Sequence, residues 1–194
     1  MSQDSIPKRG GLIRLQREGR LFPVGTYSDL VIREELTAYV VYVSGIAACD
    51  PTTGIVAGYE AHSGEYATNA LELQVADVFC QLDRHLTLLA DNLNRRCVVE
   101  HVEDEAKEGD VSMLNLCKVV VCLRGDRPMD FRRFDDAYRA EFTRRGIGSY
   151  PCRTTTMGHH LPTESALVEM DFELWIPKVS EEIKKTLRDW GISL

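Results

Sequence analysis

The chain has 194 residues, of which 44% are hydrophobic and 27% are charged, and its 30 acidic and 23 basic side chains give a net charge of −7. This length and composition fit one globular domain and exclude wholesale disorder. No apolar run approaches the roughly 18 residues that a bilayer crossing needs, which excludes a membrane span. The negative charge repels the phosphate backbone and therefore disfavours bulk binding to nucleic acid.

Six cysteines are scattered through the chain without a CxxC pair or a histidine at metal-ligand spacing. They are Cys49, Cys80, Cys97, Cys117, Cys122 and Cys152. The N-terminal residues lack a hydrophobic signal core, which predicts a cytoplasmic protein whose thiols are reduced and mostly buried in the core. A mitochondrial location is the alternative, because Arg14, Arg17 and Arg20 resemble a targeting segment, although Asp4 and Glu18 argue against one.

The first third of the chain predicts an extension followed by strands. Residues 1–24 show little periodicity and predict an N-terminal extension. β-branched and aromatic residues predict strands over 30–34 and 39–44. The Asp-Pro-Thr-Thr-Gly segment at 50–54 has the composition of a turn, and residues 55–56 predict the returning strand of a hairpin.

The clearest helix is predicted over residues 71–93. Its apolar residues recur at steps of three and four, which places them on one face of a helix. They are Leu71, Val75, Val78, Leu82, Leu86, Leu89 and Leu93. Thr68 or Asn69 is a suitable N-cap. The acid-rich segment 94–112 breaks this pattern and predicts a solvated insertion.

The second half predicts a strand, a helix, two strands and a tail. A buried strand is predicted over 116–123, and strands follow over 153–157 and 167–175. A second helix is predicted from Asp130 to Gly146. Its buried face is expected to carry Phe131, Phe134, Tyr138 and Phe142. The tail, residues 177–194, predicts a short helix that begins near Ser180.

Two helices can cover only one face of a sheet with this many strands. The other face must then meet water or another copy of the chain. Tyr42, Thr154 and Thr156 fall in predicted strands, so that part of this face is not strongly polar. These observations predict an α+β fold and a homo-oligomer.

Several segments, in this order, resemble the Rid (YjgF) family, whose members also carry the name endoribonuclease L-PSP. The segments are Tyr42-Val43-Ser44-Gly45, Asp50-Pro51-Thr52-Thr53-Gly54, Lys118-Val119-Val120-Val121, Asp130-Phe131, Pro151-Cys152-Arg153-Thr154-Thr155, Leu161-Pro162 and Ala166-Leu167-Val168-Glu169-Met170-Asp171. The resemblance covers residues 25–176. It implies a chorismate-mutase-like fold and a homotrimer with ligand sites between neighbouring subunits.

The resemblance also implies an enzyme that hydrolyses reactive 2-imino or enamine acids, such as 2-aminoacrylate or 2-iminobutyrate, to 2-keto acids and ammonia. Arg153 matches the arginine that binds the substrate carboxylate, and Glu169 matches the carboxylate that positions or activates water. Tyr27, Gly45 and Thr155 match residues that line the pocket. A guanidinium can hold a carboxylate by two parallel hydrogen bonds, and an imine is already electrophilic, so no metal or other cofactor is expected.

The chain departs from the family pattern at positions that bear on the substrate. Asp135 stands where the second helix usually carries an asparagine, and its carboxylate could pair with Arg153 and compete with an anionic substrate. Ile46 stands where many members have glutamine, and Thr155 where several have cysteine. The spacing from Arg153 to Glu169 is one residue longer than is common. These changes affect substrate preference rather than the fold.

Two other functions remain open from the sequence. One is an endoribonuclease acting on single-stranded RNA, which the second family name suggests but which the net charge of −7 disfavours. The other is a non-catalytic trimer that binds a small metabolite. A metal site is not expected, because His62, His85 and His101 are isolated and the pair His159-His160 has no third ligand nearby in the sequence.

Overall fold

Six strands form one mixed sheet in the computed structural model, which describes residues 12–15, 28–35, 38–100, 111–125, 131–178 and 189. In spatial order the strands are β1 (Leu12–Leu15), β2 (Leu30–Glu34), β3 (Ala38–Ala47), β8 (Val168–Pro177), β6 (Leu116–Arg124) and β7 (Cys152–His159). All neighbouring strands are antiparallel except β6 and β7. A parallel pair needs a crossover connection, and α2 (Phe131–Arg144) supplies it.

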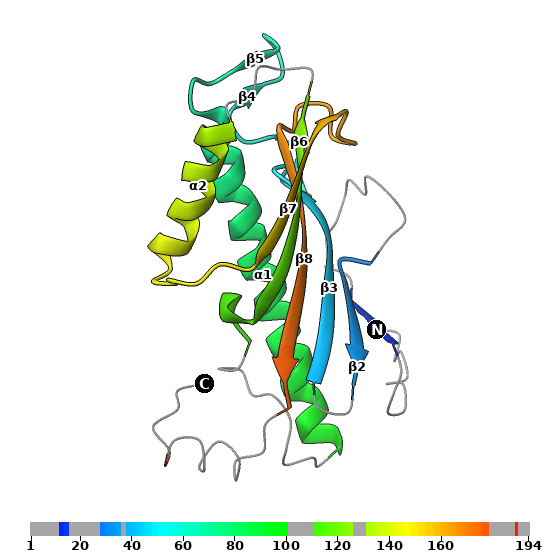
Figure 1. The fold of residues 1–194 in the computed structure, drawn as a ribbon. Coiled ribbons are helices and arrows are strands. Elements are labelled where there is room, and N and C mark those ends of the chain that lie inside the picture. Colours follow the sequence, from blue (N-terminus) through cyan, green and yellow to red (C-terminus); the bar gives the residue numbers. More distant parts are fainter. Residues whose placement is uncertain are drawn as a thin grey trace.

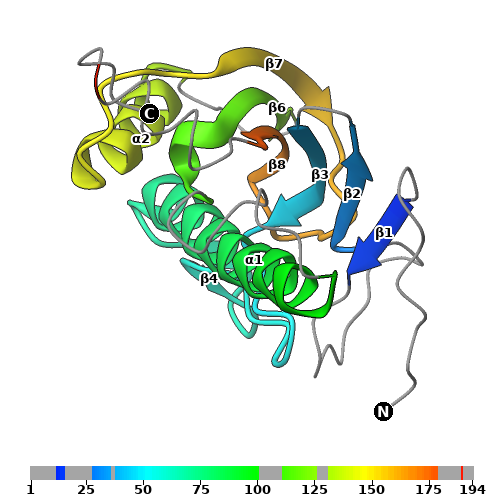
Figure 2. The same cartoon turned by 90° about the horizontal axis from the view of Figure 1, so that it is seen from below.

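The two long helices cover one face of this sheet. α1 (Ala70–Glu100) and α2 lie on the same side of the strands in both views (Figure 1; Figure 2). We call the opposite side the open face; it carries Tyr42, Val120, Glu169, Asp171 and Trp175. The prediction that the two helices would cover only one face of the sheet is therefore confirmed.

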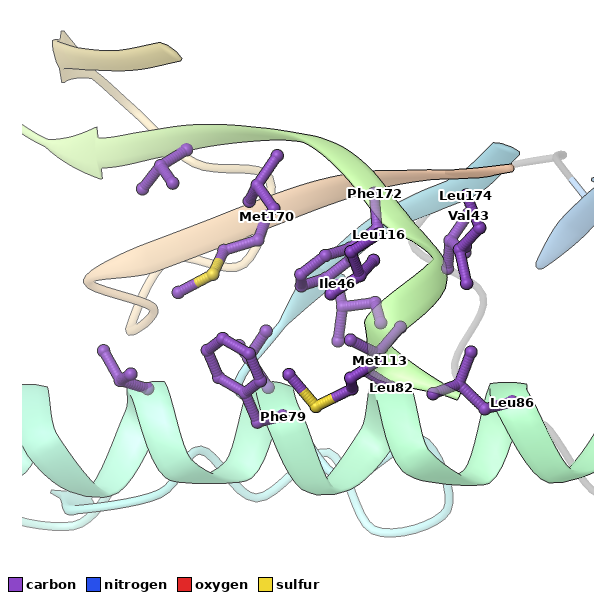
Figure 3. Close-up of a cluster of buried hydrophobic side chains, with 14 of the residues drawn as sticks. Val43, Ile46, Phe79, Leu82, Leu86, Met113, Leu116, Met170, Phe172 and Leu174 are labelled. Atoms are coloured by element: carbon purple, nitrogen blue, oxygen red, sulfur yellow. The ribbon is translucent and has the colours of Figure 1, made fainter. Parts of the chain in front are cut away.

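The core lies between α1 and the strands. All seven residues of the predicted apolar stripe of α1 are buried. Figure 3 shows Phe79, Leu82 and Leu86 of this helix directed toward strand residues that include Ile46 and Phe172. The ring of Phe79 meets Tyr138 and Phe142 of α2 and Phe172 of β8 edge to face, with ring centroids 5.6–6.0 Å apart. This one ring therefore joins both helices to the sheet.

Extra residues in β3, β6 and β7 change which side chains share a face of the sheet. Val43 is opposite Phe172 and Ile46 is opposite Met170. Between these two pairs β3 advances by three residues and β8 by two. This β-bulge leaves both Val43 and Ile46 buried under the helices. A similar irregularity lies between Leu116 and Lys118 of β6.

Some boundaries differ from the sequence prediction. The predicted extension contains β1, which pairs with β2. α1 continues seven residues past Leu93 into the predicted insertion, because a helix backbone needs no apolar residue in every turn once it has formed. Residues 101–110 of that insertion and most of the predicted C-terminal helix lie outside the described residues.

The turn at 50–54 is confirmed, since Asp50 Oδ1 accepts hydrogen bonds from the backbone of Thr52 and Thr53. The returning strand at 55–56 is wrong, because only one isolated bridge, from Cys49 to Val56, follows the turn. The hairpin lies further along, between β4 (Tyr59–Glu60) and β5 (Glu65–Tyr66).

The cysteines differ from the expectation as well. Of the five whose side chains are described, Cys80, Cys117 and Cys152 are exposed and Cys49 and Cys122 are half-buried, so they are not core residues. The core positions of these strands and helices are taken by larger apolar side chains instead. These five described cysteines are free thiols in the structure.

Replacing Phe79 with alanine should remove the contact that joins three elements. We expect Phe79→Ala to lower the free energy of unfolding by about 3–5 kcal/mol, because it leaves a cavity in the core. Leu73→Ala, on an exposed position of the same helix, should change it by about 0.5 kcal/mol or less. Urea unfolding followed by circular dichroism measures both variants, and equal losses would contradict this account of the core.

Candidate functional site

Arg153 lies on β7, at the edge of the sheet, and projects toward α2. In the parallel pairing of β6 and β7 it is opposite Val119, whose side chain is fully buried under the helices. Residues directly opposite one another in a ladder project from the same face. Thr155 follows two residues later, opposite Val121, and therefore shares this face with Arg153.

Three aromatic rings of α2 surround the guanidinium. Its Cζ lies 4.8 Å from the ring centre of Tyr138, 5.4 Å from that of Phe134 and 5.7 Å from that of Phe131. We call these three residues the aromatic cluster. A cation at such distances from ring faces is stabilised by their quadrupoles. Arg153 keeps 21% of its side-chain surface exposed, so it is accessible from outside.

Phe131 differs from its predicted burial. It is 44% exposed, whereas Phe134, Tyr138 and Phe142 are buried as expected. Phe131 is the first residue of α2, and its ring lies beside Arg153 and 6.2 Å from that of Phe134. It therefore contributes to the outer wall around the guanidinium rather than to the core.

The expected ion pair between Arg153 and Asp135 is present. Arg153 Nη2 donates to Asp135 Oδ1 at 2.8 Å, and Arg139 Nη2 lies 2.7 Å from Asp135 Oδ2. One carboxylate is thus shared between two guanidinium groups. Within the described part of the chain, Nε and Nη1 of Arg153 have no hydrogen-bond acceptor. The guanidinium therefore keeps donors for a second acceptor.

The hydroxyl of Tyr138 is buried in the same place. Among the described residues it has no hydrogen-bond partner. Its pKa is raised to about 12, mainly because burial disfavours the phenolate; Arg153 opposes this rise, while Asp135 and Tyr150 add to it. Tyr138 therefore stays protonated and can donate a hydrogen bond beside the guanidinium.

Glu169 lies on the open face, against the backbone of Gly45. The bulge in β3 brings Ser44 and Gly45 to this position, and Glu169 is opposite Ala47 in the ladder. A Cβ at residue 45 would overlap Oε1 of Glu169 and lie only 3.0 Å from its Cδ. The close approach of the carboxyl group therefore requires glycine at position 45.

The surroundings of Glu169 favour its neutral form. Burial raises the pKa of its carboxyl group, and the nearby charge of Asp171 raises it further. Burial also raises the pKa of Asp171. Asp171 helps to line a cavity of about 340 Å³ on the open face, together with Ser28, Tyr42, Ser44, Lys118 and Glu173.

The structure divides the predicted site residues into two groups. Arg153, Asp135 and Thr155 lie on the face covered by the helices, whereas Gly45 and Glu169 lie on the open face. β6 separates the strands that carry Arg153 and Glu169, which places them about 10 Å apart across the sheet as well as on opposite faces. One chain alone therefore does not bring the two groups together. Tyr27 lies outside the described residues.

Arg139 and the contact of the aromatic cluster with Arg153 were not predicted from the sequence. Arg139 follows Asp135 by four residues, a spacing at which opposite charges meet on a helix, so this signal was present in the sequence. The contact of the cluster with Arg153 depends on how β7 lies against α2, which no local pattern reveals. The side chains that the structure describes contain no group of three metal-ligating residues, and the helices in that part of the chain include none that could span a membrane.

No protein-family model and no curated protein matches this sequence. Solved structures do match it. RidA from the Antarctic bacterium Psychrobacter sp. is 20% identical with a TM-score of 0.52, and the match covers 84% of this chain and 99% of RidA. Yeast Mmf1 is 19% identical with a TM-score of 0.53, over 88% of this chain and all of Mmf1.

A third similar structure contains a ligand. Escherichia coli TdcF with bound serine is 15% identical to this chain with a TM-score of 0.51, and the match covers 84% of this chain and 98% of TdcF. At such identities the likeness establishes a shared fold. The α+β architecture predicted from the sequence is therefore confirmed.

Glu169→Gln should change how stability depends on pH. A carboxyl group whose pKa is raised by folding stabilises the folded state below its unfolded pKa, and this contribution is lost as the pH rises through the folded value. We therefore expect the variant to gain stability relative to the unmodified protein as the pH rises above about 4.5, the ordinary value for glutamate. Chemical denaturation between pH 4 and 8 measures this difference.

Glu173→Gln, on the same face of β8, is the matched control because it removes a carboxylate that does not lie against Gly45. A stability difference for Glu169→Gln that stays constant over this pH range would show that the Glu169 carboxyl group is not perturbed.

Proposed function

We propose that this chain, which has the fold of the Rid (YjgF) proteins, is a hydrolase that deaminates reactive 2-imino acids to 2-keto acids and ammonia. The observation that carries the proposal is Arg153, a partly exposed guanidinium at the edge of the sheet that has donors without an acceptor among the described residues. 2-Aminoacrylate and 2-iminobutyrate are the expected class of substrate. The protein would act without a metal or other cofactor and in the cytoplasm.

Arg153 would bind the carboxylate of the substrate. Asp135 uses one N–H of Nη2, so the second N–H of Nη2 and an N–H of the adjacent nitrogen form an edge that can donate two parallel hydrogen bonds to an incoming carboxylate. The aromatic cluster limits the directions in which the guanidinium can turn. A fixed carboxylate orients the adjacent C=N carbon for attack by water.

Glu169 would orient and deprotonate the water. In this step water adds to the C=N carbon, the water proton passes to the carboxylate, and the C–N bond then breaks to release ammonia. A carboxyl group with a raised pKa is a stronger base than an ordinary glutamate and can return its proton to the leaving nitrogen. Gly45 leaves room for the carboxyl group at this position.

A second copy of the chain would complete the site. Because Arg153 and Glu169 lie on opposite faces, a neighbouring subunit must bring its open face to the edge strand β7 of the first. A homotrimer with three sites between subunits meets this requirement. The serine bound to TdcF, a protein of the same fold, supports a small amino-acid-like ligand for such a site.

Arg153→Ala should abolish most of the activity. We expect kcat/KM for 2-iminobutyrate, generated in place by a dehydratase, to fall about 100-fold or more. Arg153→Lys should lose about tenfold, because lysine keeps the charge but not the planar fork. Arg84→Ala, at an exposed position of α1, is the control and should retain full activity.

The same preparations separate this proposal from its alternatives. An assembled protein that does not accelerate imine decay above the rate in buffer contradicts the deaminase. Cleavage of single-stranded RNA by a nuclease-free sample, unchanged in Arg153→Ala, would favour the endoribonuclease. Binding of 2-oxobutyrate without any hydrolysis would favour a binding protein.

Mixed assemblies test whether two chains form each site. Arg153→Ala and Glu169→Gln subunits should each be inactive alone, but random mixing should restore about a quarter of the normal activity, because a quarter of the interfaces then pair an intact Arg153 with an intact Glu169. The two variants are denatured and refolded together, and the recovered hydrolytic activity is measured. A mixture of unmodified and doubly substituted chains, treated in the same way, is the control. No recovery in mixed trimers would place both residues in one subunit.

A further inference from the structure

Asp135 gives the guanidinium of Arg153 an internal counter-ion. Its carboxylate bonds to Arg153 at 2.8 Å and to Arg139 at 2.7 Å, and its own side chain is only 19% exposed. The two arginines differ in their exposure, because 63% of the Arg139 side chain faces solvent and 21% of that of Arg153 does. A ligand that binds Arg153 therefore lies beside the carboxylate of Asp135, which contacts the same guanidinium.

This counter-ion changes which ligands Arg153 can bind well. A ligand carboxylate on the edge of the guanidinium that Asp135 leaves unoccupied shares Arg153 with Asp135, so two carboxylates come within a few ångströms of one another. The aromatic cluster excludes water from one side of this group and so weakens the screening of their repulsion. A ligand whose only charged group is a carboxylate is therefore fully subject to the repulsion from Asp135.

In a ligand with a positively charged nitrogen next to its carboxylate, attraction of this nitrogen to Asp135 offsets the repulsion between the two carboxylates. Asp135 bonds to the two arginines through one contact at each oxygen, and a carboxylate can accept about four hydrogen bonds. An ammonium or iminium group on the carbon next to the ligand carboxylate can therefore donate to Asp135 while the carboxylate bonds to Arg153. The ligand then matches a cation and an anion that lie side by side.

We propose that Asp135 is a specificity-determining residue that selects zwitterionic amino and iminium acids over 2-keto acids of the same shape. The inference rests on the proposed function, since it assigns the charge state of the substrate in that site. In the overall reaction, R–C(=NH2+)–COO− and water give R–C(=O)–COO− and NH4+. The substrate is neutral overall and the keto-acid product is an anion, so Asp135 favours substrate over product and assists product release.

The test compares two ligands that differ at one group. L-2-Aminobutyrate and 2-oxobutyrate have the same carbon chain, and calorimetric titration into the assembled full-length protein measures their affinities. We expect aminobutyrate to bind about tenfold more tightly or better, and Asp135→Asn to reduce this ratio about tenfold by strengthening 2-oxobutyrate binding. Asp136→Asn, which removes the adjacent carboxylate of α2, should leave the ratio unchanged.

A second measurement needs no variant. If charge sets the preference, raising the salt concentration from 50 to 500 mM should reduce the ratio of affinities in the unmodified protein. The inference is overturned if the ratio of the aminobutyrate to the 2-oxobutyrate affinity is unchanged in Asp135→Asn, or if it falls equally in Asp136→Asn. It is also overturned if the unmodified protein binds neither ligand.

Imine hydrolysis measured on the same samples separates the two proposals. If the unmodified protein hydrolyses the imine but the ratio of ligand affinities is unaltered in Asp135→Asn, the role of Asp135 is rejected and the proposed deaminase activity is retained. A ratio that shifts as expected in a protein without hydrolytic activity rejects the deaminase and retains the charge selection by Asp135.

Discussion

The alternation of side chains along β6, β7 and β8 determines where Arg153, Thr155 and Glu169 lie. Two helices bury one face of the sheet, and apolar residues of these strands occupy that face. Because successive side chains of a strand point to opposite faces, the polar residues that alternate with the apolar ones project from the other side. Thr155 and Arg153 of β7 are exceptions, and of these two Arg153 is the charged one. It occupies a position that would be buried on an inner strand, but β7 is the edge strand, where the face toward α2 is only partly covered.

This exception depends on a long-range arrangement. Asp135 and Arg153 are 18 residues apart in the chain and form a direct ion pair, because α2 is the crossover that returns the chain from β6 to the parallel strand β7. The same crossover places the three aromatic side chains of the cluster, from about two turns of α2, against the guanidinium. An arginine with this surrounding is held by rings on one side and by a carboxylate at its end, with little freedom to reorient.

The sequence was informative where a pattern reflects burial directly. The three- and four-residue steps of α1 predicted its buried residues correctly, since the pattern repeats over several turns. The end of α1 and the hairpin of β4 and β5 were not predicted, because short or solvent-facing segments carry little apolar signal. The exposure of Phe131 and the separation of Arg153 from Glu169 follow from pairings between distant strands, which periodicity does not encode.

The bulge of β3 makes this part of the chain sensitive to its length as well as to its composition. With one residue fewer between Val43 and Ile46, the strand would regain a regular pleat, and every position from Ile46 onward would exchange sides relative to β8. Ile46 would then turn outward, and the glycine would lose its place under the Glu169 carboxyl group. Single-residue deletions here should therefore be tolerated less well than most substitutions, and related chains should conserve the number of residues in this strand more strictly than their identities.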